Sequence, residues 1–221
     1  MEKKKYNHVF WDWNGTILDD LNVNFEVINA LLSMHEKNSI SLREYRSVFS
    51  FPIKEFYGKI GLPIDDKKYE QLVSDYWNLY KNRIKDIPLM AGVLDILCVL
   101  RKIGVKQYIL SASDKIMIFD QISMYGIQDY FEDIIAPHDG YASGKIELAK
   151  QWMSNQNIST SNVILIGDTI HDYETAKAIG IDCALIDSGH QDLNVFKYDS
   201  NLMIFNNIDE MRCHIFGIKV D

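Results

Sequence analysis

Short apolar runs that end at polar turns alternate with stretches of helical spacing along most of this chain. The first run, residues 6–11, is apolar and aromatic and leads directly into Asp-Trp-Asn-Gly-Thr, a pattern typical of a buried strand that ends in a turn. From residue 90 onward the two patterns alternate regularly. Strands are predicted at 107–110, 133–136, 162–166, 183–186 and near 203, and helices at 93–103, 115–125, 146–153, 173–179 and towards 216.

This alternation predicts a fold of the α/β class. Strands separated by helices pair in parallel, and right-handed crossovers place the helices on the faces of the sheet. We therefore predict a doubly wound parallel sheet built from residues 1–19 and 89–221. In such a sheet the ligand site lies beyond the carboxyl ends of the strands. The residues just after each apolar run are thus the first candidates for chemistry.

Residues 20–88 follow a different pattern, in which helical spacing recurs without strands. The helical stretches lie near 21–35, 42–49, 54–60 and 69–85, and the breakers between them are Ser39, Pro52, Gly61 and Pro63. We predict an all-helical insert after the first strand. The aromatic cluster of Tyr76, Trp77 and Tyr80 is expected in the core of this insert rather than around a ligand.

Composition narrows the class of protein. The chain has 221 residues, with 23 Lys and Arg against 31 Asp and Glu, which gives a formal net charge of −8. A chain of this length can bury a sizeable core, and a hydrophobic content of 47% excludes disordered classes. Residues 20–88 hold ten acids and ten bases, so the excess of acid lies elsewhere. No basic stripe is present, which argues against a nucleic-acid partner.

The cysteines and the absence of an apolar leader indicate the compartment. Cys98, Cys183 and Cys213 are widely spaced without a CxxC pair, which favours unpaired thiols in a reducing environment. The basic start reaches Asp12 before a long apolar run forms, and no stretch has the ~18 apolar residues of a membrane span. We expect a cytoplasmic protein that does not contact a membrane.

Three carboxylates stand at the ends of predicted strands. Asp12 ends the first apolar run and precedes Gly15, Asp168 follows the strand at 162–166, and Asp172 lies one helical turn further on. A turn would explain Asp12 alone, and helix capping would explain Asp168 alone. Neither explains three converging carboxylates. Hard cations such as Mg²⁺ prefer carboxylate and carbonyl oxygens, so these residues form a candidate magnesium site.

Two further residues suit a phosphate group. Ser111 ends the strand at 107–110, where its hydroxyl could donate to a phosphate oxygen. Lys145 stands at the start of a predicted helix, where its ammonium could hold both the phosphate and a nucleophilic carboxylate. Each residue alone is of a kind that is usually solvated, and their order along the chain is what gives them meaning.

The four segments together resemble the haloacid dehalogenase superfamily of phosphotransferases. Its DxDGT motif is matched by residues 12–16, its second motif by the strand that ends at Ser111, its lysine by Lys145 and its GDxxxD motif by residues 167–172. The resemblance covers essentially the whole chain. It implies a Rossmann-like core, with residues 20–88 as a small α-helical cap like that of the phosphoglycolate-phosphatase-like branch.

The resemblance also implies which residues react and bind metal. Asp12 would be the nucleophile that becomes an aspartyl phosphate. Mg²⁺ would bind the Asp12 carboxylate, the backbone carbonyl of Asn14 and Asp168. Asp172 would be a further ligand or would hold a water ligand of the ion. The implied activity is that of a magnesium-dependent phosphatase of the phosphoric monoester hydrolase class, acting on a small phosphorylated metabolite.

The resemblance further implies a set of groups that bind the substrate. Ser111, Ala112 and Lys145, with the backbone near Gly15 and Thr16, would stabilise the charge of the transferring phosphoryl group. The cap would close over the site and select the leaving group.

Asn14 departs from the family pattern. The family has an aspartate at this position that protonates the leaving alcohol and then activates water. The side-chain amide of Asn14 cannot exchange a proton near neutral pH, although its backbone carbonyl can still bind metal. His171 and His138 lie in loops beside the motifs and are candidates for the missing acid and base.

Two alternatives to the phosphatase therefore stay open. One is a weakly active phosphate-binding or regulatory protein, because Asn14 replaces the acid. The other is a phosphonatase-type hydrolase, which would use a cap lysine such as Lys54. Lys54 is also a candidate to meet an anionic leaving group in a phosphatase. The expected partner is a small phosphorylated metabolite, and the chain is expected to be a monomer or a homodimer.

Overall fold

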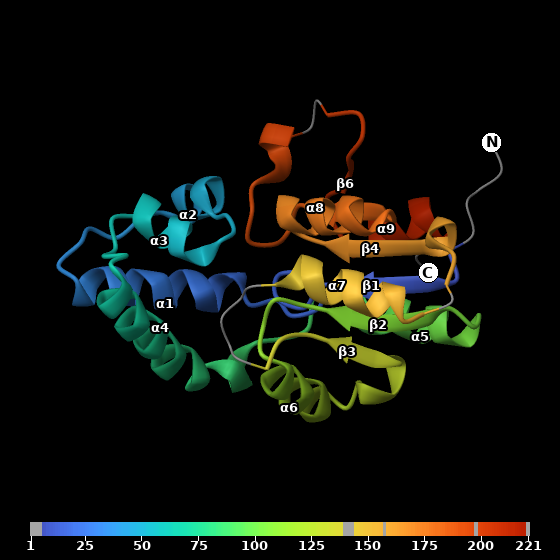
Figure 1. Cartoon of the computed structure of the whole chain (residues 1–221), viewed down its shortest axis with the longest axis horizontal. Coiled ribbons are helices and arrows are strands. Elements are labelled where there is room, and N and C mark those ends of the chain that lie inside the picture. The colour runs from blue at the N-terminus through green and yellow to red at the C-terminus, as the bar shows by residue number, and fades with distance from the viewer. Residues whose placement is uncertain (1–5, 139–143, 157, 197–198, 220–221) are drawn as a thin grey trace.

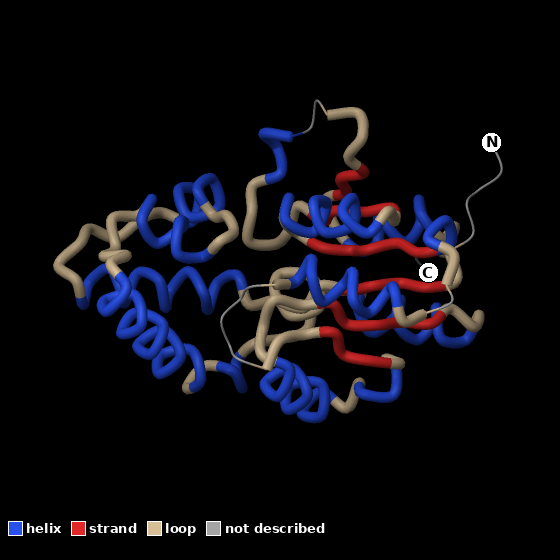
Figure 2. The backbone as a smooth tube through the Cα atoms, in the orientation of Figure 1, coloured by secondary structure: helices blue, strands red, loops and turns tan. Residues whose placement is uncertain are grey.

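The core of the protein is a six-stranded parallel sheet with the order β3-β2-β1-β4-β5-β6 (Figures 1 and 2). A computed structural model describes residues 6–138, 144–156, 158–196 and 199–219. The strands are β1 His8–Trp11, β2 Lys106–Leu110, β3 Asp133–Ile135, β4 Val163–Gly167, β5 Asp182–Ile186 and β6 Met203–Phe205. The prediction of a doubly wound α/β fold is confirmed.

Alternate residues of each strand pack against helices on opposite faces of this sheet. On one face Val9 and Trp11 share a buried cluster with α5 Val93–Lys102, α6 Lys115–Tyr125 and α9 Ile208–Ile215. On the other face Phe10 packs with α7 Lys145–Ser154 and α8 Ile170–Ile179, which lie side by side in front of the sheet (Figure 1). Burial on both faces explains why the strands read as continuous apolar runs.

The helical insert forms a hydrophobic cluster of its own beside one end of the sheet (Figure 1). It contains α1 Leu21–Met34, α2 Leu42–Val48, α3 Ile53–Lys59 and α4 Asp66–Lys81. Local signals set several of these ends. Ser41 and Glu44 form a capping box at the start of α2, and the Asp65 side chain accepts a hydrogen bond from the Lys68 N–H at the start of α4. The expected helical insert is therefore present.

Predicted and observed elements agree closely, with two informative differences. The helix expected at 69–85 begins three residues earlier, because Asp65 caps it, and ends at Lys81 before a short 3₁₀ turn at Ile84–Asp86. The helix expected at 173–179 begins at Ile170, because Thr169 and Asp172 form a capping box there. In both cases a side-chain cap extended the helix beyond its apolar spacing.

Two expectations from composition can be compared with the structure. Cys98, Cys183 and Cys213 are all free thiols, as the spacing predicted. Within the described ranges, none of the helices combines the length and the apolar character needed to cross a membrane.

Candidate functional site

Three carboxylates meet at the carboxyl ends of two neighbouring strands. Asp12 directly follows β1, Asp168 directly follows β4, and these two strands are paired in the sheet. Asp172 lies in the first turn of α8, and one carboxylate oxygen from each residue lies within 4.8 Å of the others. All three side chains are buried. The structure thus brings together the three acids that the sequence singled out.

Glycines make room for these carboxylates. Gly15 has a φ of +72°, a left-handed conformation that favours glycine, and a Cβ at this position would collide with the Asp168 carboxylate. A Cβ on Gly189 would also collide with Asp168, and one on Gly167 would collide with Asp172. The backbone at these three glycines can therefore lie close to the Asp168 and Asp172 carboxylates only because it carries no side chain there.

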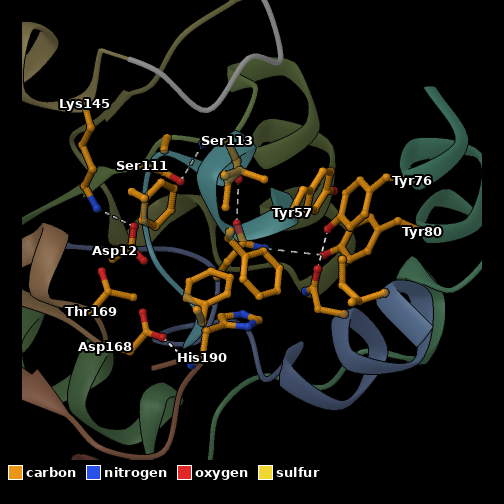
Figure 3. Close-up of a pocket in the computed structure, with 18 of the residues that line it drawn as sticks. Asp12, Tyr57, Tyr76, Tyr80, Ser111, Ser113, Lys145, Asp168, Thr169 and His190 are labelled. Carbon is orange, nitrogen blue, oxygen red and sulfur yellow. Dashed lines mark hydrogen bonds and ion pairs between the residues drawn. The ribbon is translucent and has the colours of Figure 1, made fainter. Parts of the chain in front are cut away.

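Lys145 is the cation inside this cluster of acids. It is the first residue of α7, and its side chain is only 2% exposed. Its Nζ lies 2.6 Å from Oδ1 of Asp12 (Figure 3) and 2.5 Å from Oδ1 of Asp172. The Oδ2 atom of Asp12 has no hydrogen-bond partner among the described residues. One oxygen of Asp12 is therefore held, and the other is left for a ligand.

Asp172 has hydrogen-bond donors on both of its oxygens. Its Oδ1 accepts from Lys145, and its Oδ2 accepts from the Thr169 N–H at 3.0 Å and the Thr169 hydroxyl at 2.7 Å. Burial by itself would raise the pKa of Asp172, but the Lys145 ammonium and the Thr169 donors bring this pKa below its ordinary value. Asp172 is therefore an ionised group whose oxygens are already engaged.

Burial has the opposite net effect at the other two acids. It raises the pKa of Asp12 to about 8, although Lys145 opposes the shift, and raises the pKa of Asp168 to about 6. Asp168 accepts hydrogen bonds from the Thr16 hydroxyl at 3.3 Å and from the His190 backbone N–H at 2.6 Å. Among the described residues, Lys145 pairs with Asp12 and Asp172, Asp168 has no ion pair, and the cluster is short of positive charge. A divalent cation would fit this shortage, and carboxylate oxygens are ligands that Mg²⁺ prefers.

The polar groups at the end of β2 suit an anionic ligand. Ser111 is buried, lines the pocket, and its Oγ accepts a hydrogen bond from the Ser113 N–H at 3.1 Å, which leaves the hydroxyl hydrogen available to a ligand. Ala112 also lines the pocket, whereas Gly15 and Thr16 do not. The Gly15 N–H donates to the Asp20 carboxylate and to the Leu18 carbonyl, and the Thr16 N–H donates to the Trp13 carbonyl. Both N–H groups are therefore already used inside the protein.

Asn14 lines the pocket with its amide fixed at both ends. Its Nδ2 donates to Oδ2 of Asp20 at 2.6 Å, and its Oδ1 accepts from the Ser113 hydroxyl at 2.6 Å. An amide satisfies both partners. A carboxylate in its place would meet the Asp20 carboxylate at hydrogen-bond distance and would repel it unless one of the two held a proton. The environment of this position therefore favours asparagine.

Asp20 is fully buried at the start of α1 and gathers several donors. Besides Asn14, it accepts from the Gly15 N–H at 2.8 Å and from Nδ2 of Asn24 at 2.6 Å, and His190 Nε2 lies 3.0 Å away. Burial by itself would raise the pKa of Asp20, but the charge of His190 and these donors lower it below its ordinary value. Asp20 is thus a buried carboxylate that fixes the loop after β1.

His190 is a pocket residue that sequence reasoning missed. Its Nε2 faces Asp20, and its Nδ1 lies 2.9 Å from the hydroxyl of Tyr45 in α2. Burial lowers the pKa of this imidazole, but Asp20 outweighs it and raises the pKa above its ordinary value. Both ring nitrogens therefore have partners in the protein. Its position in the sequence could have identified it, because His190 closely follows the carboxyl end of β5, where ligand sites are expected.

Three further residues that the sequence nominated do not line this pocket. The ring of His171 stacks on Phe51, with the centroids 4.8 Å apart, and His138 is exposed. The Nζ of Lys54 pairs with Oδ1 of Asp66 at 2.7 Å, and the Lys54 side chain is 39% exposed. The structure does not bring these side chains to Asp12.

The acids and the helical insert share one pocket (Figure 3). It contains about 1060 Å³ of space between protein atoms, counting the part that is open to solvent. Residues of the core and of the insert both line it, so a bound molecule can contact both. Lys145, Asp12 and Asp168 lie on the side of the sheet, while Tyr76 and Tyr80 lie on the side of the insert (Figure 3).

Comparisons with solved structures show how widely this fold occurs. A predicted phosphatase from Clostridium acetobutylicum is 19% identical, with a TM-score of 0.81 over 97% of this chain and 100% of its own. Protein Tyrosine Kinase A from Mycobacterium tuberculosis is 20% identical, with a TM-score of 0.76 over 96% and 98% of the two chains. A predicted phosphoglycolate phosphatase from Haemophilus somnus is 12% identical, with a TM-score of 0.69 over 91% and 94%. At these identities the likeness shows a common fold.

Sequence comparison gives the family. None of the curated protein sequences matches this chain. A family model described as haloacid dehalogenase-like hydrolase matches residues 9–186, a range that contains Asp12, Lys145, Asp168 and Asp172. With most of the chain and the whole buried ion cluster inside this match, the protein belongs to the haloacid dehalogenase-like hydrolases.

Proposed function

We propose that this hydrolase is a magnesium-dependent phosphatase that acts on a small phosphorylated metabolite through an aspartyl phosphate on Asp12. The observation that carries the proposal is the Lys145 ammonium, which holds one oxygen of Asp12 while the other stays available in the pocket. Two proteins of the same fold are described as predicted phosphatases, which adds support.

The proposed metal ligands are Asp12, Asp168 and the backbone carbonyl of Asn14, with Asp172 as a further ligand or as a support for the ligand set. The three acids offer only hard oxygen donors, which fit Mg²⁺. When bound, the ion supplies positive charge to the phosphoryl oxygens and offsets the excess of buried carboxylate.

The chain's own residues account for the phosphoryl transfer. The available oxygen of Asp12 attacks phosphorus, and the bond between phosphorus and the leaving oxygen breaks with its electron pair on that oxygen. Lys145 keeps the attacking carboxylate in place, and the Ser111 hydroxyl donates to a phosphoryl oxygen. Water then hydrolyses the aspartyl phosphate, which releases phosphate and restores the carboxylate.

In this proposal, residues 20–88 act as a cap that is docked on the core. Arg46 of α2 donates to the Asp187 carboxylate at 2.9 Å and to the backbone oxygens of Gly189 and Gln191 at 3.0 Å. Tyr45 contacts His190 in the same loop. The insert therefore binds the loop whose His190 N–H donates to Asp168. While the insert is docked on this loop, it keeps water from the acids.

A second candidate is a phosphate-binding or regulatory protein that turns over poorly. The observation that favours it is the amide of Asn14, which is held by Asp20 and Ser113 and cannot transfer a proton. His190 does not replace it, because both of its ring nitrogens are bonded to Asp20 and Tyr45. The phosphonatase alternative gains nothing from Lys54, which lies outside the pocket lining.

The nucleophile is tested by Asp12→Asn. We expect phosphate release from acetyl phosphate and aryl phosphates to fall by about 10³-fold or more, because the neutral amide cannot form the phosphoenzyme. The matched control is Asp95→Asn, which changes an exposed carboxylate in α5 and should leave turnover unchanged. Substantial turnover by Asp12→Asn would rule out this mechanism. Wild-type protein that binds phosphate with Mg²⁺ but releases none from any ester would support the second candidate.

The metal site is tested by the pH dependence of Mg²⁺ binding. In the metal-free chain Asp12 and Asp168 have raised pKa values, about 8 and about 6, so protons must leave before the ion can bind. Apparent affinity measured by calorimetry should therefore rise with pH, by up to about tenfold per unit between the pKa of Asp168 and that of Asp12, where only Asp12 still has to lose its proton. Affinity that is constant between about pH 6 and about pH 8.5 would contradict the ligand assignment.

A pair of variants ranks the ligands in the same measurement. Asp168→Ala should weaken Mg²⁺ binding more than Asp172→Ala, because Lys145 and Thr169 already use both oxygens of Asp172.

The missing acid is tested by Asn14→Asp. Without a proton donor, wild-type protein should hydrolyse acyl and aryl phosphates far better than alkyl phosphates, because only the former leave easily as anions. In the variant, the new carboxyl and Asp20 should share a proton, which the leaving oxygen can take. Alkyl phosphate hydrolysis should then rise by about 10²–10⁴, while aryl phosphates change much less.

Asn24→Asp is the matched control for this variant. It places a carboxylate against the same Asp20 oxygen, at the same 2.6 Å contact, but from α1. It should give no selective gain for alkyl esters. A wild-type enzyme that cleaves alkyl and aryl esters equally well, with no effect of Asn14→Asp, would show that another group supplies the proton.

A further inference from the structure

The wall of the pocket opposite the acids is aromatic. On α4 the lining residues are Tyr69, Val73, Tyr76, Trp77 and Tyr80, which share one face of the helix by their spacing. Tyr76 and Tyr80 stack nearly parallel, with an angle of 15° between the rings and 5.5 Å between the centroids. The cluster was expected in the core of the insert, but only Tyr76 packs against the hydrophobic cluster of the insert. Tyr76, Trp77 and Tyr80 all pack against the cluster of Val9 and Trp11 on the sheet, and all three line the pocket.

The other helices of the insert continue this wall. Phe49, Phe51, Phe56 and Tyr57 line the pocket from the segment of α2 and α3, and Ile28 lines it from α1. Residues 20–88 are all described, and the pocket lining takes nine aromatic residues, three aliphatic ones and Asn24 from them. The insert therefore contributes no charged side chain to the pocket.

Three cations of the α2 and α3 segment do not line the pocket and have partners elsewhere. Arg46 pairs with Asp187 of the core, and Lys54 pairs with Asp66. The Nζ of Lys59 donates to the Ser50 hydroxyl at 2.7 Å. A carboxylate on the organic part of a substrate would lose its hydration against this wall without gaining an ion pair there.

Resting on the proposed phosphatase function, we propose that the pocket takes a phosphate monoester whose organic part is an uncharged aromatic ring, joined to phosphorus through a phenolic oxygen. The phosphate lies against Lys145 and Ser111, and the ring lies against Tyr76, Trp77 and their neighbours. Contacts between aromatic rings stabilise a bound ring beyond the burial of apolar area alone.

The pKa of the leaving group also favours an aryl phosphate. Phenols have a pKa near 10, so a phenolate leaves without the proton that Asn14 cannot give. The Asp12 oxygen bonds to phosphorus as the bond from phosphorus to the phenolic oxygen breaks. The electron pair departs with the phenolate, which takes its proton from water. The aromatic wall of the pocket and the missing proton donor therefore favour the same class of substrate, the aryl phosphates.

Binding of phosphonates tests the ring preference without depending on turnover. Calorimetry with Mg²⁺ present compares benzylphosphonate, propylphosphonate and 2-carboxyethylphosphonate. These share a phosphonate but end in a ring, an alkyl chain or a carboxylate. Benzylphosphonate should bind at least about tenfold more tightly than propylphosphonate, and the carboxylate analogue should bind most weakly. Equal affinity for the three, or a preference for the carboxylate, would overturn the inference.

Val73→Arg tests the same wall by adding a cation to it. The variant should lose about tenfold in benzylphosphonate affinity and gain affinity for 2-carboxyethylphosphonate. Gln71→Arg is the matched control, because Gln71 is exposed on the same helix and does not line the pocket. It should leave both affinities unchanged. Trp77→Leu, which removes a ring but keeps an apolar side chain, should reduce the benzyl preference several-fold even where Val73→Arg disturbs folding.

Turnover separates this inference from the proposed function. Hydrolysis of acetyl phosphate without any preference for benzylphosphonate over propylphosphonate would keep the phosphatase and reject the aromatic substrate class. Tight benzylphosphonate binding without hydrolysis of acetyl or phenyl phosphate would reject the phosphatase and support the aromatic pocket. A phosphatase of the proposed class shows both hydrolysis of phenyl phosphate and the binding preference.

Discussion

Lys145 lies between Asp12 and Asp172 with almost no water around it, and the rest of the site is arranged about these two ion pairs. Removing water from charges is costly, so such a cluster persists only where every charge has a close partner. The first turn of α7 supplies the lysine, and the capping box of α8 holds Asp172. Asp168 is left with neutral hydrogen-bond donors, which is why we assign a divalent cation to this end of the cluster.

A second buried pair joins the core to the insert. Asp20 and His190 lie 3.0 Å apart, far from each other in sequence, and Tyr45 of α2 bonds the other side of the imidazole. The same carboxylate holds the amide of Asn14 beside the acids. The side chain that would act as proton donor in the family pattern is thus part of a structural network here. In the proposed reaction these residues position and bind the substrate, and the reactivity of the leaving group has to supply what the acid does not.

The strands, the helices and four polar positions of the site could be predicted because they depend on local patterns. Apolar runs mark buried strands, and Asp12, Ser111, Lys145 and Asp168 stand at the strand ends or helix start that such runs define. His190 was missed because its role depends on Asp20, which no local pattern relates to it. The aromatic residues of α4 were assigned to a core alone, since helical spacing does not reveal that a face packs and lines a cavity at once.

The central claim is that Asp12 presents one free oxygen to a phosphoryl group while Lys145 holds the other. A crystal structure of the protein with Mg²⁺ and beryllium fluoride, which mimics a phosphoryl group on a carboxylate, tests this most directly. We expect beryllium bonded to Oδ2 of Asp12, with the Lys145 contact to Oδ1 kept and the Ser111 hydroxyl facing a fluoride. Beryllium fluoride bound to another residue, or a free Asp12 carboxylate beside an occupied metal site, would contradict the account.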